Sequence, residues 1–113
     1  MASIDEQPMV IVLSPTGTLD AYTVGGFRSA LAQLPVGPAR VVINLTTITF
    51  LDSAGLGAIV GAVRRIREMG GRVAVAAVGA PARVLRTAGL DRIVTVVGHP
   101  DEANAALEDA ATE

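Results

Sequence analysis

The sequence has 113 residues, half of them hydrophobic and 18% charged, which predicts one packed domain over residues 1–113 and excludes a disordered chain. A formal net charge of -2 and an aromatic content of 3% argue against nucleic-acid binding, and the lack of cysteine excludes disulfides and cysteine nucleophiles. With no signal-peptide pattern and no apolar run of about 18 residues, we expect a cytoplasmic protein without membrane insertion.

The first half of the chain alternates strand-like and helix-like patterns. Residues 9–13 are a continuous apolar run of strand length, and the Ser-Pro-Thr-Gly sequence at 14–17 predicts a turn after it. Residues 18–20 lead from this turn into a helix predicted over 21–34, whose apolar residues recur at helical spacing. A β-branched run then predicts a central strand over 40–45.

The second half continues the alternation. A strand-like run ends at Leu51, and the clearest predicted helix follows from Ser53 to a stop at Gly70-Gly71, with its buried stripe at Leu56, Ile59, Val60, Val63 and Ile66. The remaining predictions are a strand over 72–78, a short helix over 81–85 ended by Gly89, a strand over 92–97 and an Ala-rich helix that opens at Pro100. A short extra strand near Ile4 is also possible. The alternation of strands and helices predicts an α/β fold.

Residues 50–57, Phe-Leu-Asp-Ser-Ala-Gly-Leu-Gly, lie where the strand-like run meets the long helix. Backbone N–H groups at the start of a helix have no partner within it, so such a junction favours anions, and Ser53 is a candidate phosphate acceptor. The alternative is that Asp52 or Ser53 only caps the helix, because both residue types are favoured N-caps. The local pattern alone favours the cap.

Gly55 and Gly57 fall in the first turn of this helix, where each costs about 1 kcal/mol relative to alanine. Two compensations stay open: close packing against a neighbouring strand, which is the more common, or an approach path for the backbone of a partner. A Gly-x-x-x-x-Gly-Lys phosphate loop is absent from the sequence.

Asp20 precedes the first predicted helix as Asp52 and Ser53 precede the second, and sites in α/β folds usually lie at such strand ends. One interpretation makes Asp20 a helix cap, with Thr23 as a competing cap. The other makes Asp20 a second carboxylate that orients the Ser53 hydroxyl by a hydrogen bond.

A serine hydrolase is not supported. Ser53 lies in Leu-Asp-Ser-Ala-Gly rather than in a Gly-x-Ser-x-Gly elbow, and the single histidine, His99, sits in a Gly-His-Pro sequence typical of a solvated turn. We therefore predict neither a catalytic residue nor a metal ligand.

Five segments together resemble bacterial anti-anti-sigma factors, or anti-sigma factor antagonists, which are stand-alone STAS domains. The resemblance extends over residues 9–110 and rests on the segments 17–20, 41–45, 50–57, 70–71 and 87–90. Its most specific element is Asp-Ser-Ala-Gly-Leu-Gly at a strand-to-helix junction. The resemblance implies a mixed β-sheet of four to five strands, with about four helices mostly on one face.

The resemblance also implies a protein switch that needs no cofactor and is not an enzyme. In similar proteins the serine after the aspartate, here Ser53, is phosphorylated by an anti-sigma factor that is also a serine kinase, and a metal-dependent phosphatase reverses the reaction. The unphosphorylated form binds the kinase and frees the sigma factor. The residues that this resemblance places at the partner contact are Asp20, Thr23, Leu51, Asp52, Ala54, Gly55, Leu56 and Gly57.

Ala54 stands where many relatives carry serine or threonine, which leaves Ser53 as the only hydroxyl in the Asp-Ser-Ala-Gly-Leu-Gly element. Two other functions share the STAS fold and stay open: a subunit of a lipid-transport ABC complex, and a subunit of a stress-sensing assembly. The second usually carries an extra sensory domain, for which 113 residues leave no room.

Overall fold

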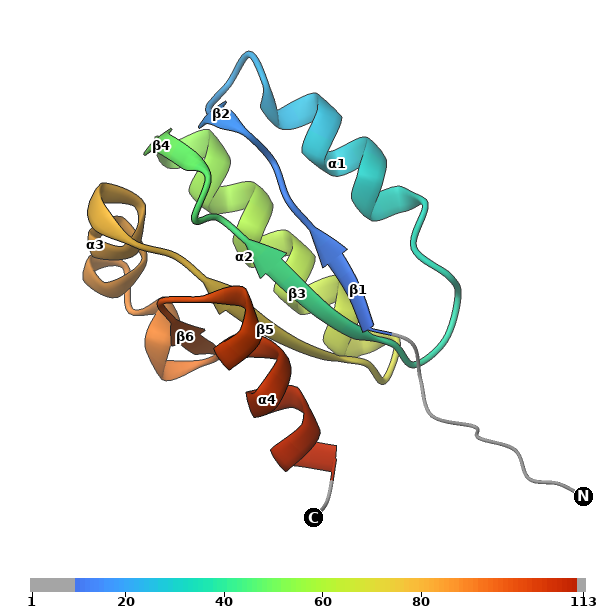
Figure 1. The fold of residues 1–113 in the computed structure, drawn as a ribbon. Helices are drawn as coiled ribbons and strands as arrows, with labels where there is room; N and C mark the ends of the chain where they lie inside the picture. The colour runs from blue at the N-terminus through green and yellow to red at the C-terminus, as the bar shows by residue number, and fades with distance from the viewer. Residues whose placement is uncertain (1–9, 112–113) are drawn as a thin grey trace, which may run out of the picture.

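The computed structural model of the chain describes residues 10–111 (Figure 1). Its strands are β1 (Val10–Leu13), β2 (Gly17–Leu19), β3 (Arg40–Asn44), β4 (Ile48–Leu51), β5 (Arg72–Ala76) and β6 (Thr95–Val97). Its helices are α1 (Val24–Ala32), α2 (Ser53–Glu68), α3 (Gly79–Thr87) and α4 (Pro100–Ala111), with a 3-10 turn, η1, at Leu90–Arg92. No helix in this part of the chain has the length and apolar character to span a bilayer.

The main sheet has the strand order β1-β3-β5-β6, and all of its pairings are parallel. Residues of β3 and β5 that face one side, such as Val41 and Val75, pack into a core with α1, α2 and α3. Residues that face the other side, such as Val42 and Ala74, pack against Ala103 and Leu107 of α4. Helices α2 and α4 therefore lie on opposite sides of the sheet (Figure 1), which confirms the predicted α/β class with most helices on one face.

Strands β2 and β4 form a separate two-stranded parallel ribbon that the sequence pattern did not predict. Residues 18–20 were expected only to lead into a helix, and the run that ends at Leu51 was not given a partner. The two strands have three and four residues, and β4 buries only its first and last, Ile48 and Leu51, so neither shows a clear period of two. The extra strand expected near Ile4 lies outside the described residues.

Several predicted boundaries were wrong for local reasons. Helix α1 begins at Val24 rather than at residue 21, because residues 20–23 form a hydrogen-bonded turn. Helix α3 is longer than predicted, and β6 begins only at Thr95 because η1 occupies part of the predicted strand. The limits of α2 and the burial of Ile59, Val63 and Ile66 are confirmed, while Leu56 and Val60 are half-buried.

Candidate functional site

The carboxyl ends of β2 and β4 lie side by side and carry the candidate site. Leu19 is paired with Leu51 across the ribbon, and the backbone N–H of Asp52 donates to the carbonyl oxygen of Leu19 at 3.3 Å. Helix α2 begins at the next residue, Ser53. The topology therefore brings the Asp20 loop and the start of α2 to one edge.

Asp52 is the N-cap of α2. Its Oδ1 accepts a hydrogen bond from the N–H of Gly55 at 3.0 Å, and its carbonyl oxygen accepts from the N–H of Leu56 at 2.9 Å. Of the two residues considered for capping, Asp52 alone has this role. The Ser53 side chain is exposed, and its hydroxyl has no hydrogen-bond partner among residues 10–111. Capping therefore does not explain why a serine stands at position 53.

Asp20 organises its own loop. Its Oδ1 accepts hydrogen bonds from the N–H groups of Tyr22 at 2.9 Å and Thr23 at 3.1 Å and from the Thr23 hydroxyl at 3.2 Å. The same hydroxyl donates to the carbonyl oxygen of Thr18 at 2.8 Å. Between residues 10 and 111 no hydrogen bond joins Asp20 to Ser53. The N-cap of α1 is Thr23, so the prediction that Asp20 caps the helix is wrong, and Asp20 instead forms a turn before it.

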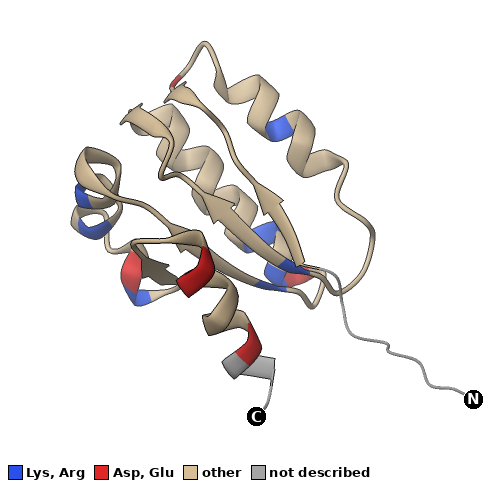
Figure 2. Ribbon diagram, viewed as in Figure 1, with Lys and Arg blue, Asp and Glu red and all other residues tan. Residues whose placement is uncertain are grey.

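These contacts also set the charge of Asp20. Partial removal from water raises the pKa of the carboxyl, but the hydrogen bonds from Tyr22, Thr23 and Thr18 outweigh it and leave the pKa lowered. Asp20 is therefore ionised at neutral pH. In the ribbon coloured by charge, its acidic segment lies at the β2–α1 end, away from the arginine segments of α3 and of the carboxyl end of α2 (Figure 2).

The two glycines of the α2 start have different environments. A Cβ at Gly55 would lie 2.2 Å from the carbonyl oxygen of Leu19 and 2.7 Å from Cδ1 of Leu51, so Gly55 is required by close packing. A Cβ at Gly57 would meet no atom within 4 Å, and this residue is exposed. Packing therefore explains Gly55 and does not explain Gly57.

An apolar groove of about 410 Å³ adjoins the site between α2 and α3. Leu56 forms its α2 wall, and the α3 side is formed by Ala80, Arg83, Val84, Thr87 and Ala88. Of the other predicted contact residues, Ala54 is half-buried and Leu51 is buried. Leu51 therefore supports the edge from the core and offers little surface itself.

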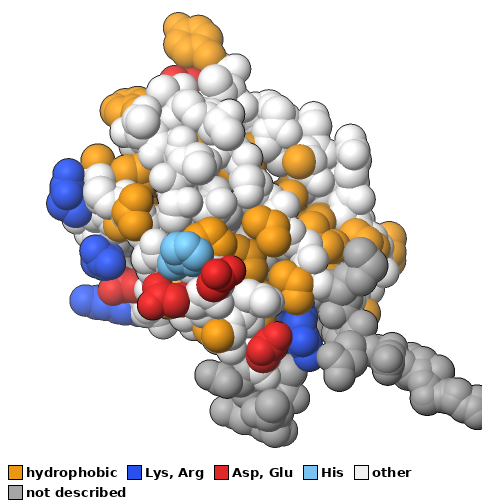
Figure 3. Space-filling view, viewed as in Figure 1, with side chains coloured by type: hydrophobic (Ala, Val, Ile, Leu, Met, Phe, Trp, Pro, Cys, Tyr) orange, Lys and Arg blue, Asp and Glu red, His pale blue; other side chains and the backbone are white. Residues whose placement is uncertain are grey.

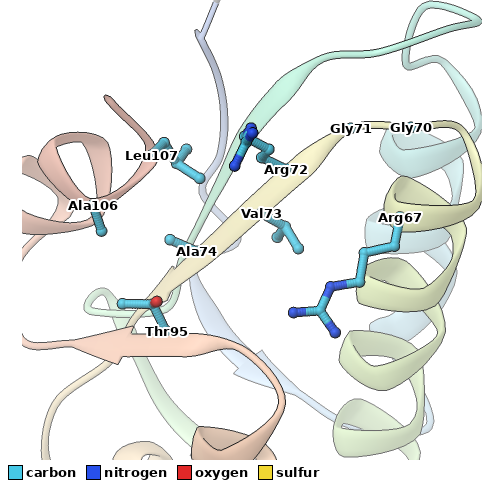
Figure 4. Close-up of a pocket in the computed structure, with 9 residues that line it drawn as sticks. All are labelled: Arg67, Gly70, Gly71, Arg72, Val73, Ala74, Thr95, Ala106 and Leu107. Atoms are coloured by element: carbon cyan, nitrogen blue, oxygen red, sulfur yellow. The ribbon is translucent and has the colours of Figure 1, made fainter. Parts of the chain in front are cut away.

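A second cavity, of about 470 Å³, lies at the amino end of β5 (Figure 4). Arg67, Gly71 and Arg72 contribute to its lining, and the Arg67 guanidinium donates to the carbonyl oxygen of Ile93. Arg67 is fourteen residues beyond Ser53 on α2, so at 1.5 Å per residue the two are about 21 Å apart along the helix. This cavity is not part of the candidate site.

Nothing in the described residues adds catalytic or metal-binding groups to the edge. Residues 10–111 contain no cluster of three or more histidine, aspartate or glutamate side chains that could hold a metal ion. His99 lies at the start of α4, where its Nδ1 accepts a hydrogen bond from the N–H of Asp101 at 3.0 Å. The imidazole therefore has a local structural role.

Two residues of this edge were not singled out from the sequence. Tyr22 is 96% exposed at the tip of the Asp20 loop, and Phe50 is 52% exposed on β4. The scarcity of aromatic residues was the signal in the sequence that could have identified Tyr22 and Phe50. The chain has one tyrosine and two phenylalanines, and Tyr22 and Phe50 lie within three residues of Asp20 and Ser53, respectively.

Comparisons with known proteins place the chain in a family and a fold. The family model for the STAS domain matches residues 1–103. An anti-sigma F factor antagonist from Paenibacillus polymyxa is 31% identical over 102 residues, which cover 88% of this chain and 86% of that protein.

Solved structures give the same result for the fold. The crystal structure of an anti-sigma factor antagonist from Mycobacterium paratuberculosis superposes with a TM-score of 0.78 at 27% identity, covering 92% of this chain and 90% of that one. A sulfate transporter family protein from Wolinella succinogenes superposes with a TM-score of 0.77 at 15% identity, covering 92% of this chain and 88% of that one, a likeness that shows the fold alone. The fold is thus shared by proteins of different roles, and the residues of the site must separate them.

Proposed function

The chain belongs to the STAS domain family and is an anti-sigma factor antagonist by homology, and from this premise we propose that phosphorylation of Ser53 switches its binding to an anti-sigma factor. Antagonists of this class are regulators rather than enzymes. The proposed partner is an anti-sigma factor with serine kinase activity, which the unphosphorylated chain binds so that a sigma factor is released. A metal-dependent serine phosphatase would restore the unphosphorylated form. Since sigma factors act on RNA polymerase, the proposed place of action is the cytoplasm.

The free hydroxyl of Ser53 carries the proposal. Asp52 already caps α2, and the Ser53 side chain is exposed at the first position of the helix. Transfer of the γ-phosphoryl group of ATP to Oγ of Ser53 would form one P–O bond and break another, releasing ADP and the hydroxyl proton. The modification needs no unfolding and displaces no hydrogen bond among residues 10–111. Ala54 offers no competing hydroxyl beside it.

The surroundings of Ser53 supply the proposed contact surface. Asp20 and Thr23 form one side, the start of α2 with Asp52, Ala54 and Gly57 forms the centre, and Leu56 leads into the groove against α3. Gly57 fits this picture because nothing inside the fold requires a glycine there. A partner backbone could approach α2 at this point without meeting a side chain.

The size of the switch follows from electrostatics. A phosphate adds about -1.5 to -2 charges at neutral pH. At an effective dielectric constant of about 20, one like-charge pair about 6 Å apart costs roughly 3 kcal/mol. The helix dipole at the start of α2 stabilises a phosphate by only about 0.3 to 2 kcal/mol. Repulsion from the nucleotide phosphates that the kinase holds would therefore weaken binding roughly a hundredfold.

The first experiment tests the acceptor. The chain is incubated with ATP and each purified anti-sigma kinase of the same genome, and the labelled peptide is identified by mass spectrometry. Trypsin leaves Ser53 in the peptide 41–64 together with Thr46, Thr47 and Thr49, so fragment ions must locate the phosphate. We expect label on Ser53 only and none in the Ser53→Ala variant. Full labelling of Ser53→Ala would contradict the assignment.

The second experiment separates charge from shape. Ser53→Asp and Ser53→Asn differ in charge but hardly in size, and both are compared with wild type for binding to the kinase that labels Ser53. We expect Ser53→Asp to bind at least about tenfold more weakly than Ser53→Asn, because the charge of a carboxylate acts in the same direction as that of a phosphate. Equal affinities would show that charge is not the signal.

A further inference from the structure

The exposed aromatic side chains of this protein are concentrated at the Ser53 edge. Of the three aromatic residues in the sequence, Phe27 is buried in the core, whereas Tyr22 is 96% and Phe50 is 52% exposed. In the space-filling view, hydrophobic side chains project at the β2–α1 end of the molecule (Figure 3). Exposed aromatic groups gathered beside a functional group are typical of protein–protein contacts, where tyrosine and phenylalanine are enriched.

The backbone beneath Tyr22 is held by the hydrogen bonds of the Asp20 loop. The N–H of Tyr22 donates to Oδ1 of Asp20, and the next residue, Thr23, is tied to Asp20 and to Thr18. A loop whose backbone is already ordered loses less conformational entropy when it binds. Tyr22 is therefore displayed on a preformed backbone.

Phe50 is exposed in a part of β4 where buried and exposed side chains do not alternate. Ile48 and Leu51 are buried, whereas Thr49 and Phe50 between them are exposed. The register partner of Phe50 on β2 is Thr18. At 52% exposure, about half of Phe50 stays accessible to a partner.

The footprint of a protein partner includes this region. A stable interface buries about 800 Å² on each partner, which corresponds to a disc about 16 Å in radius. Phe50 precedes Ser53 by three residues, a distance of at most about 11 Å along the chain. A partner surface of this size centred on Ser53 would reach Phe50 and the adjoining Asp20 loop.

We propose that Tyr22 and Phe50 are the anchor residues by which this edge binds the anti-sigma kinase and selects one kinase among several. The proposal rests on the function proposed above and names the contacts that would give it specificity. Asp20 and Asp52 each stand two residues from one of the aromatic residues in the sequence, so we expect the matching surface of the kinase to be apolar, with basic or neutral groups facing these carboxylates.

The test uses the kinase that labels Ser53, with ADP in place of ATP so that no phosphoryl group is transferred. Dissociation constants and dissociation rates are measured for Tyr22→Ala, Phe50→Ala and Phe50→Thr, the last of which keeps the β propensity of the strand. The controls are Val36→Ala, at a residue 97% exposed in the loop before β3, and Ile93→Ala, at a residue 49% exposed before β6. Thermal unfolding of each variant checks the fold.

We expect each aromatic variant to bind about tenfold more weakly, mainly through faster dissociation, and both controls to bind within twofold of wild type. The same variants should lose less affinity for a second anti-sigma kinase that binds wild type weakly. Aromatic variants that bind the labelling kinase as tightly as wild type would overturn this inference and leave the proposed function standing. Absence of label on Ser53 with every kinase would overturn both.

Discussion

Replacement of Gly55 by alanine tests the contact between α2 and β2 most directly. The added Cβ would lie 2.2 Å from the carbonyl oxygen of Leu19, whereas ordinary contacts of this kind begin near about 3.4 Å. A backbone atom cannot turn aside as a flexible side chain can, so the start of α2 would have to move by about 1 Å. The same carbonyl oxygen accepts the N–H of Asp52, and this hydrogen bond would be weakened.

These effects can be added. Overpacking of this kind costs about 1 to 3 kcal/mol, and the weakened hydrogen bond costs about 0.5 to 1.5 kcal/mol. The higher helix propensity of alanine stabilises the helix by about 1 kcal/mol relative to glycine. We therefore expect Gly55→Ala to lower the free energy of unfolding by about 0.5 to 3.5 kcal/mol, measured by urea denaturation.

Gly57→Ala is the matched control, two residues further along the same helix. Its Cβ would meet nothing within 4 Å, so only the helix propensity changes and the variant should be more stable than wild type by up to about 1 kcal/mol. Opposite signs for the two variants are the expected result. A Gly55→Ala protein as stable as wild type would refute the close contact with Leu19.

Two further predictions concern the carboxylates of the edge. Asp52→Ala should lower the free energy of unfolding by about 1 kcal/mol, because the N–H of Gly55 loses its acceptor, while Asp52→Asn should keep most of the stability. Urea denaturation at neutral pH compares the two variants, and equal losses of stability would exclude the capping role of Asp52. Because the pKa of Asp20 is lowered on folding, its carboxylate stabilises the fold above its unfolded pKa of about 4 and loses this effect as pH falls through the folded pKa. The stability difference between wild type and Asp20→Asn should therefore be constant from about pH 5 to 7 and shrink below about pH 4, and a difference that grew on acidification would contradict the hydrogen bonds of this loop.

The sequence predicted the long elements of this fold better than the short ones. Helix α2 has an apolar stripe over four turns and a cap at its start, and its limits were confirmed. The run that ends at Leu51 was predicted as strand-like and is β4, but β2 and its pairing with β4 were not predicted, because three residues carry too little periodicity and the pairing depends on contacts distant in sequence. The edge of the candidate site is built on this unpredicted ribbon.

The residue types of the site were predicted, but not the division of roles among them. Asp52 and Ser53 were equal candidates for the cap, and only the hydrogen bond from Gly55 separated them. The two glycines looked equivalent as well, and the approach of Leu19 to Gly55 shows that they are not. Such distinctions depend on how the chain packs in three dimensions, which residue types alone do not encode.

The cap provided by Asp52 has a consequence for how a signal could be stored. Since Asp52 holds the start of α2, the neighbouring hydroxyl contributes nothing to stability, and a phosphate on Ser53 would occupy solvent. Attraction by the start of α2 and repulsion from the Asp52 carboxylate act on that phosphate in opposite directions, so the two forms should have similar free energies of unfolding. The cell would hold a constant stock of this protein, and information would reside in the ratio of its two forms rather than in their total amount.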